Sequence, residues 1–189
     1  VTSCIPKSKT LSEHEVLVNW GIDEVQVLRN IGINAPSPIE GRYEWTGRYD
    51  PYDHQKDTAS FMTLNKKSFC FNEQGTGKTA SAIWASDYLL TQGREIIEGD
   101  ADYVIINYDG VEIVQDAVAE GGFDLIIVDE ATHYKNVQTK RWKTLNKLVN
   151  KDTWLWMMTG TPAAQSPTDA YGIAKLVNPN GVPRFFGSF

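Results

Sequence analysis

The sequence predicts an α/β fold in which a parallel sheet lies between two layers of helices. From residue 51 onward, short apolar segments alternate with segments of helical pattern, which is the order of a parallel sheet with crossover helices. The apolar runs FDLIIVDE (123–130) and TWLWMMTG (153–160) are continuous, as expected for strands that are covered on both faces. An apolar fraction of 41% in 189 residues is enough for one sizeable core with an appendage.

Residues 1–50 are predicted to form a small, mainly helical N-terminal extension. Pro, Gly and aromatic residues are frequent in its last part, which is predicted to be an ordered loop leading into the main domain. Two short helices with plausible capping residues are predicted before that loop: 12–20 with Ser12 as N-cap, and 23–32 with Asp23 as N-cap and Gly32 as C-cap.

The main domain, residues 51–189, is predicted to contain strands and helices in alternation. The predicted strands are 68–72, 102–108, 123–130 and 153–160. The predicted helices are 53–65, 78–90, 111–121, 139–149 and, with Ser166 as N-cap, 166–177.

Charge is unevenly distributed along the chain, whose formal net charge is −6. Residues 95–130 contain eleven acidic residues and no Lys or Arg, whereas residues 135–151 contain six Lys or Arg and no acid. The basic run has two interpretations that the sequence leaves open: a solvated helix face, or a surface that faces a polyanion.

Several classes of protein are disfavoured by composition. Cys4 and Cys70 are too few and too far apart for a disulfide framework, so both are interpreted as free thiols in a reducing compartment, with Cys70 buried. The three His residues show no metal-ligand spacing. The sequence has neither a signal-peptide pattern nor an apolar run near the roughly 20 residues that span a bilayer. We therefore expect a cytoplasmic protein (in the host cytoplasm if it is viral) without a membrane partner. The first residue is Val, which indicates a fragment or a processed product.

A glycine-rich stretch, NEQGTGKT (72–79), lies between a predicted strand and a predicted helix. The strict phosphate-binding pattern GxxxxGK[ST] has Gly where Asn72 stands, so only GTGKT (75–79) matches it. Glycines let successive backbone N–H groups turn toward a phosphate, and the helix N-terminus adds positive potential. Lys78 is then placed to reach the β- and γ-phosphates, and the Thr79 hydroxyl to ligate Mg²⁺. We interpret the stretch as a phosphate-binding loop rather than an ordinary turn.

Two adjacent acids, Asp129 and Glu130, end the apolar run before them. Buried carboxylates at a strand end are costly without a cation, although a plain exit into solvent would also explain them. Downstream of a phosphate loop, the pair predicts Asp129 as a Mg²⁺ ligand and Glu130 as the residue that positions and polarises an attacking water. The TGTP stretch (159–162) also follows an apolar run, and on its own it is only a turn.

Taken in order, these segments resemble the first RecA-like lobe of a superfamily 2 helicase or translocase. The resemblance rests on Gln55 in PYDHQ, GTGKT, DEAT (129–132) and MTGTP (158–162). DLIIVDEATHYKN and SPTDAYG are most similar to the Swi/Snf-like branch, including phage-encoded DEAD/DEAH-type helicases. The resemblance covers about residues 50–189 and implies a three-layer α/β/α P-loop domain that uses ATP and Mg²⁺.

The resemblance implies a role for each matching residue. Gln55 matches the glutamine that reads adenine, and Tyr52 is a secondary candidate for stacking nearby. Catalytic roles fall to Lys78, Asp129 and Glu130, and Mg²⁺ ligation to Thr79 and Asp129. The remaining matches are motif I (Gly75, Thr76, Gly77, Lys78 and Thr79), motif III, which couples the nucleotide site to nucleic acid and the second lobe (Thr159 and Thr161), and the KN pair after motif II (Lys135 and Asn136).

The chain departs from the family pattern at three places. Thr132, followed by His133, stands where motif II usually has His or Asp. Only TQGREIIEGDA (91–101) stands where motif Ia is expected, so that motif is predicted to be missing. No second RecA-like lobe follows residue 189, so the isolated chain is expected to bind nucleotide but to hydrolyse it weakly.

The leading interpretation is therefore the ATP-binding lobe of a DNA-dependent ATPase of helicase or translocase type. Its expected partners are nucleic acid, DNA rather than RNA, and a second RecA-like lobe. Two other classes stay open. A P-loop kinase or other small NTPase would not need Gln55 or TGTP. A non-catalytic nucleic-acid-binding module has only the basic run 135–151 in its support.

Overall fold

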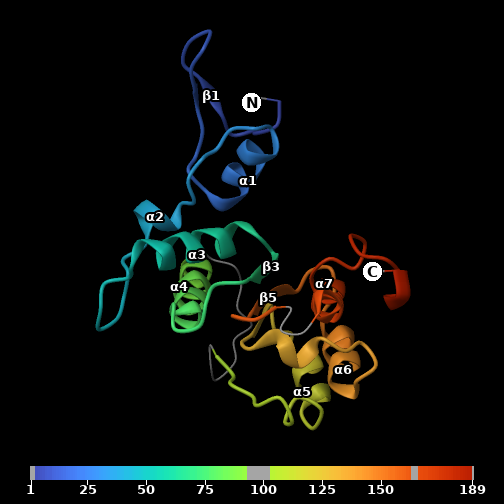
Figure 1. The fold of residues 1–189 in the computed structure, drawn as a ribbon. Helices are drawn as coiled ribbons and strands as arrows, with labels where there is room; N and C mark the ends of the chain where they lie inside the picture. Colours follow the sequence, from blue (N-terminus) through green and yellow to red (C-terminus); the bar gives the residue numbers. More distant parts are fainter. Residues whose placement is uncertain (1–2, 93–102, 163–165, 189) are drawn as a thin grey trace.

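A parallel three-stranded sheet lies at the centre of the protein (Figure 1), whose computed structural model describes residues 3–92, 103–162 and 166–188. The strands are β3 (Lys67–Cys70), β4 (Leu125–Val128) and β5 (Trp154–Met158), and their order is β3-β5-β4. The predicted α/β class is confirmed. Because the three strands run in the same direction, the loops that follow them meet at one edge of the sheet.

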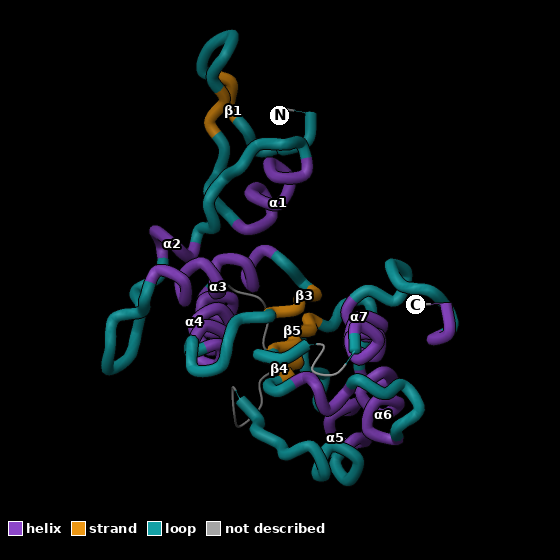
Figure 2. Tube along the Cα trace, in the orientation of Figure 1, coloured by secondary structure: helices purple, strands orange, loops and turns teal. Residues whose placement is uncertain are grey.

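Helices cover both faces of this sheet (Figure 2). One layer contains α3 (Asp53–Leu64) and α4 (Lys78–Thr91), and the other contains α5 (Gln115–Glu120), α6 (Lys140–Leu148) and α7 (Tyr171–Val177). Side chains of the central strand alternate between the two layers. Trp154, Trp156 and Met158 join the cluster with α3 and α4, whereas Leu155 and Met157 join the cluster with α6 and α7. This double burial explains the continuous apolar run of β5.

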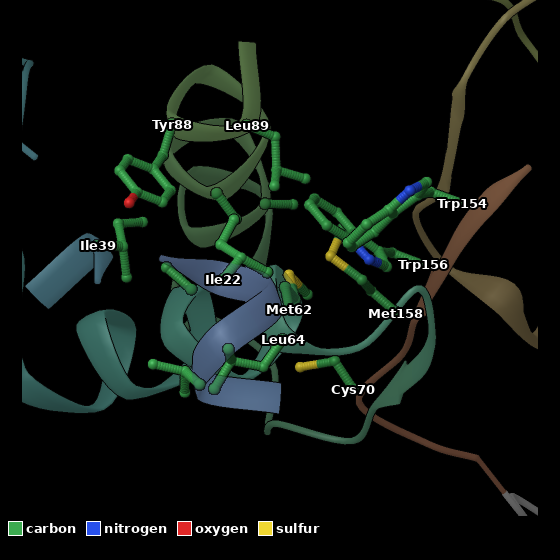
Figure 3. Close-up of a cluster of buried hydrophobic side chains, with 14 residues drawn as sticks. Ile22, Ile39, Met62, Leu64, Cys70, Tyr88, Leu89, Trp154, Trp156 and Met158 are labelled. Carbon is green, nitrogen blue, oxygen red and sulfur yellow. The ribbon is translucent and has the colours of Figure 1, made fainter. Parts of the chain in front are cut away.

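The larger apolar cluster joins the sheet to the N-terminal helices (Figure 3). Met62 of α3, Tyr88 of α4 and Trp156 of β5 are almost completely buried in it. The Trp156 indole N–H donates to the Asn65 carbonyl at 3.1 Å, so the one polar atom of this ring has a partner inside the core. Burying each such side chain stabilises the fold by about 1.5–3 kcal/mol. The cluster therefore fixes α3, and with it Gln55, relative to the sheet.

The N-terminal extension contains a hairpin that was not predicted. The expected helix 12–20 is wrong: β1 (Lys9–Thr10) pairs antiparallel with β2 (Val16–Leu17), and the Leu11 N–H donates to the Glu15 carbonyl at 2.9 Å. The β-branched Val16 and Val18 favour an extended chain over a short helix. Beyond the hairpin lie α1 (Ile22–Asn30) and the short α2 (Ile39–Arg42).

The predicted helix 23–32 is confirmed as α1, with one change at its start. Gly21, not Asp23, is the N-cap. Asp23 lies in the first turn, where a carboxylate interacts favourably with the helix dipole. The helix ends at Asn30 with Ile31 as C-cap, so Gly32 ends the helix from one position beyond the cap. Gly32 has φ +87°, its N–H donates to the Arg29 carbonyl at 3.0 Å, and the next N–H reaches the Leu28 carbonyl at 2.9 Å. This pair of bonds is a Schellman cap.

One predicted strand does not form. Residues 103–107 of the expected strand 102–108 are irregular and residue 102 lies outside the described residues, as does most of the segment 91–101 where motif Ia was judged missing. The irregular segment is held by side chains at its ends instead: the Tyr103 hydroxyl is 3.1 Å from Ser86 Oγ, and the Tyr108 ring lies 4.4 Å from the His133 ring.

The remaining helices lie close to their predicted positions. The predicted helix 111–121 is shortened to α5, and 166–177 begins with the 3-10 turn η2 (Pro167–Ala170) before α7. Ser166 caps that turn as expected, because its Oγ accepts from the Thr168 N–H. Two further 3-10 turns are η1 (Ala131–Tyr134) and η3 (Phe186–Ser188).

Candidate nucleotide-binding site

The glycine-rich loop (residues 71–77) connects β3 to the N-terminus of α4. Gly75 and Gly77 have φ +77° and +79°, the left-handed region that residues with a Cβ rarely adopt. A Cβ at Gly77 would also meet the Gln55 amide nitrogen, so the Gln55 side chain would have to move aside. The loop therefore has the backbone conformation and the helix N-terminus that an anion-binding loop requires.

Lys78 is the first residue of α4, and its side chain lies inside the loop. The residue is only 7% exposed, and its ammonium donates to the carbonyls of Asn72 at 3.0 Å and Glu73 at 2.9 Å. Both partners are neutral carbonyls. A phosphate offers charged oxygens, which make shorter and stronger bonds to an ammonium. The lysine is thus held where a phosphate entering the loop would compete for it.

Thr79, in the first turn of α4, and Asp129, directly after β4, are brought together. The Thr79 hydroxyl donates to Asp129 Oδ2 at 2.7 Å, although the residues are 50 positions apart in sequence. The other carboxylate oxygen accepts from the Glu130 N–H at 3.0 Å. A hydroxyl and a carboxylate oxygen are ligands that Mg²⁺ prefers, so this donor set fits the ion.

Glu130 is exposed and directly follows Asp129, and its backbone is unusual. Its φ of +48° is the only positive φ of a non-glycine residue in the described part of the chain. The Tyr108 hydroxyl donates to its carbonyl at 3.4 Å. Burial first, and then the neighbouring Tyr134, Asp129 and Glu130, raise the pKa of Tyr108 to about 12. The Tyr108 hydroxyl is therefore a donor at neutral pH.

Gln55 lies against the loop rather than facing open space. Its Oε1 accepts from the Tyr52 N–H at 3.0 Å, which caps α3, and its Nε2 donates to the Thr76 carbonyl at 3.0 Å. His54 Nε2 lies 3.1 Å from the same carbonyl. The exposed Tyr52 ring stacks on the His54 ring, with centroids 5.7 Å apart. Both rings therefore stand beside the loop, on the side of Gln55.

The turn after β5 packs on the glycine-rich loop. Buried Thr159 donates its N–H to the Cys70 carbonyl at 3.0 Å, and its hydroxyl accepts from the Thr161 N–H at 3.2 Å. A Cβ at Gly160 would lie 3.1 Å from the Gln74 backbone nitrogen, so the turn and the loop are closely packed at this contact. In the described residues, the Thr132 hydroxyl makes no hydrogen bond to this turn. A change at the loop would thus reach the turn through packing.

Lys135 and Asn136 shape the turn that leads into α6. Asn136 accepts from the Gln138 N–H at 2.9 Å, and the Lys135 ammonium is 3.5 Å from an Asp169 carboxylate oxygen. The basic run that follows is partly neutralised inside the chain by Lys140–Glu112 and Arg141–Asp109 ion pairs, each at 2.7 Å.

An open cleft of about 630 Å³ borders the loop on the α3 side. Pockets that hold small molecules commonly fall in this range of volume. Burial raises the pKa of the Cys70 thiol in its wall, so Cys70 is a packing residue rather than a nucleophile. The cleft is lined by His54, Asp57, Thr58, Phe61, Phe69, Cys70, Phe71, Asn72, Glu73 and Thr76.

Two residues around this site had no role in the sequence-based prediction. Asn72 appeared only as a departure from the strict glycine pattern, yet its amide donates to Thr58 Oγ1 at 2.7 Å and ties the loop to α3. Tyr108 was placed in a strand. The polar side chain of Asn72 was a usable signal for the first, whereas no local pattern distinguishes Tyr108.

The fold and the residues at its strand ends define a class: α/β domains with a parallel sheet and a glycine-rich loop before a helix. A profile of the SNF2-related domain matches residues 90–185, just over half of the chain. The chain therefore belongs to the SNF2-related domain family. The matched range contains Asp129, Glu130, Thr159 and Thr161, whereas Gln55 and the glycine-rich loop precede it.

Two curated proteins are similar to parts of the chain, both described as SWI/SNF-related matrix-associated actin-dependent regulator of chromatin subfamily A-like protein 1. The Xenopus laevis protein is 33% identical over 81 residues, which is 43% of this chain and 8% of that protein. The Xenopus tropicalis protein is 36% identical over 63 residues, 33% of this chain and 7% of that protein. The aligned part is thus less than a tenth of these relatives. Among the helices that the structure describes, none is both long and apolar enough to cross a membrane.

Proposed function

We propose that the chain is the ATP-binding lobe of a DNA-dependent ATPase of translocase type. The observation that carries the proposal is the 2.7 Å hydrogen bond from the Thr79 hydroxyl to Asp129. It joins the helix after the glycine-rich loop to the acidic end of a second parallel strand, which is the arrangement that Mg²⁺-dependent phosphoryl transfer needs.

Each residue then has a task on Mg·ATP. Backbone N–H groups of residues 75–79 bind the phosphates, and the Lys78 ammonium leaves its two carbonyl partners for the β- and γ-phosphates. Thr79 and Asp129 hold Mg²⁺, which neutralises charge on the phosphates when it is bound. Glu130 positions the water whose oxygen bonds to the γ-phosphorus as the bond to the β–γ bridging oxygen breaks, giving ADP and phosphate.

The base and the coupling elements complete the proposal. Gln55, His54 and Tyr52 stand beside the loop next to the cleft of about 630 Å³, so we place adenine on this side. Thr159 and Thr161 link the loop to the surface of the lobe, where nucleic acid and a second RecA-like lobe bind. Because arginines supplied from outside a phosphate site contribute on the order of 10³–10⁵ in rate, the lobe alone should hydrolyse ATP slowly.

The first experiment is Mg·ADP and Mg·ATP binding by calorimetry, with the parent chain and Lys78→Ala. Charge-assisted bonds to phosphate are worth about 1.5–3 kcal/mol, so the variant should bind roughly ten- to a hundredfold more weakly. Lys143→Ala is the matched control, because it removes an exposed lysine of α6 far from the loop in sequence. Equal affinity in the parent and Lys78→Ala would contradict the proposal.

DNA as the nucleic acid is supported by the family and by the name of the two relatives, which describes them as regulators of chromatin. Fluorescence anisotropy with matched duplex DNA and RNA would test it across a salt series. Binding that prefers DNA and weakens linearly in log affinity against log salt is expected. A preference for RNA would overturn this part alone.

A further inference from the structure

Glu130 has a backbone conformation that its own side chain does not favour. A positive φ crowds the Cβ of any residue other than glycine, so it persists only where the surroundings hold it. Glu130 is the only such residue in the described ranges. Contacts from residues other than Asp129 and Glu130 must therefore hold the Glu130 backbone in this conformation.

Tyr108 contacts the Glu130 carbonyl and the turn η1 that follows it. Its hydroxyl lies 3.4 Å from the Glu130 carbonyl, and its ring centroid lies 4.4 Å from that of His133 in the turn η1. The ring also meets Tyr134 edge-on, with centroids 5.9 Å apart. Tyr134 is itself buried in the cluster with α6 and α7. Through its hydroxyl and ring, Tyr108 connects Glu130 to a packed part of the fold.

The segment that carries Tyr108 is fastened to α6. The Arg141 guanidinium lies 5.4 Å from the centre of the Tyr108 ring and pairs with Asp109 at 2.7 Å. Lys140 pairs with Glu112 at 2.7 Å. A cation over an aromatic face and two ion pairs hold this irregular segment against the helix, although it pairs with no strand in the described part of the chain.

We propose that Tyr108 is a positioning residue that holds Glu130 in its left-handed conformation and so aims its carboxylate at the attacking water. The inference rests on the proposed ATPase function and assigns a new residue to it. The ring carries most of the effect, because 3.4 Å is long for a bond between a hydroxyl and a carbonyl. Tyr108 itself touches neither nucleotide nor metal in this role.

The test compares Tyr108→Leu and Tyr108→Phe with the parent chain. Two affinities are measured by calorimetry for each: Mg·ADP, and Mg·ADP with aluminium fluoride, which imitates the phosphoryl group in transfer. Their ratio reports how well the water-positioning side of the site is formed, and it needs no turnover. Tyr103→Phe is the matched control, since it removes a hydroxyl of the same irregular segment that bonds to Ser86 instead.

Tyr108→Leu should lower the preference for the fluoride complex on the order of ten- to a hundredfold while Mg·ADP affinity stays within about threefold, because a misplaced catalytic group costs this much and the phosphate loop is untouched. Tyr108→Phe should keep the preference within about threefold of the parent, since it retains the ring that contacts His133 and Arg141. Tyr103→Phe should match the parent. A merely structural role would lower both affinities together.

An unchanged preference in Tyr108→Leu would overturn the inference and leave the proposed function standing. A uniform loss of both affinities would overturn it as well, because Tyr108 would then support the fold in general. If Tyr108→Leu does not fold, His133→Ala removes the ring partner from the other side and should give the same selective loss. Failure of the parent to bind Mg·ADP would overturn the proposed function, and this inference with it.

Discussion

Restoring the strict glycine pattern by Asn72→Gly should destabilise the protein and weaken the nucleotide site. The Asn72 amide donates to Thr58 Oγ1 at 2.7 Å, and that hydroxyl donates in turn to the His54 carbonyl at 2.7 Å. These two hydrogen bonds therefore connect the glycine-rich loop to α3, the helix that carries Gln55. The Asn72 carbonyl, which accepts from Lys78, remains in the variant.

The expected loss of stability is the sum of two terms. A partly buried hydrogen bond contributes about 0.5–1.5 kcal/mol, and the extra conformational entropy that a new glycine gives the unfolded chain costs about 0.4–1 kcal/mol of stability. The free energy of unfolding should fall by roughly 1–2.5 kcal/mol in total. For a chain of this length the melting temperature should fall by about 2–10 °C.

Urea denaturation of the parent, Asn72→Gly, Thr58→Val and the double variant forms the assay. The two single changes remove the same bond, so the double variant should be less destabilised than their sum by about 0.5–1.5 kcal/mol. Mg·ADP affinity should decrease in Asn72→Gly, because a looser loop must be ordered on binding. If Asn72→Gly is as stable as the parent, or binds nucleotide more tightly, the hydrogen bond from Asn72 to Thr58 does not hold the loop.

Three further outcomes are expected. Gly172→Ala should destabilise the protein by about 1–3 kcal/mol in urea, because the new Cβ would lie 2.5 Å from the Tyr134 carbonyl oxygen and backbone cannot move aside cheaply; unchanged stability would contradict this packing. The pKa of Tyr43 is raised by burial, and then by Asp87, from 10.0 to about 12, so the folded state binds more protons between these values and the free energy of unfolding should fall as pH rises through them. Tyr43→Phe should flatten that slope, and an equal slope would count against the assignment. Ile105 is 96% exposed, so Ile105→Lys should change the free energy of unfolding in urea by less than about 0.5 kcal/mol, and a larger loss would contradict that exposure.

The central strands could be predicted because their local signal and their environment agree. Residues 154–158 are apolar without interruption, and the structure buries all five between two helical layers. The starts of α4 and α6 could also be predicted, because each depends on a single local residue. Gly77 begins α4 with a left-handed backbone, and the Thr139 hydroxyl caps α6 by accepting from the Trp142 N–H at 3.2 Å.

The failures share a dependence on distant contacts. Residues 103–107 have the composition of a strand, but a strand also needs a neighbour, and these residues are held by Ser86 at one end and by His133 next to the other. The hairpin at Val16 is decided by pairing with residues before it. In the candidate site, motif residues were visible one by one, whereas the 2.7 Å approach of Thr79 to Asp129 depends on the strand order.

The basic run 135–151 illustrates how the fold chooses between two interpretations that the sequence left open. Arg141 and Lys140 pair with Asp109 and Glu112, which belong to the acidic run, so part of the positive charge is already balanced within the chain. Each exposed pair contributes only about 0–1 kcal/mol, too little to hold a segment by itself. Acting with the Tyr108 ring, however, the pairs place that segment over Glu130. A polyanion that bound Lys140 and Arg141 would have to break these ion pairs, and it would release the segment that positions Glu130. We therefore interpret this part of α6 as support for the Tyr108 segment beside Glu130 rather than as a surface for nucleic acid.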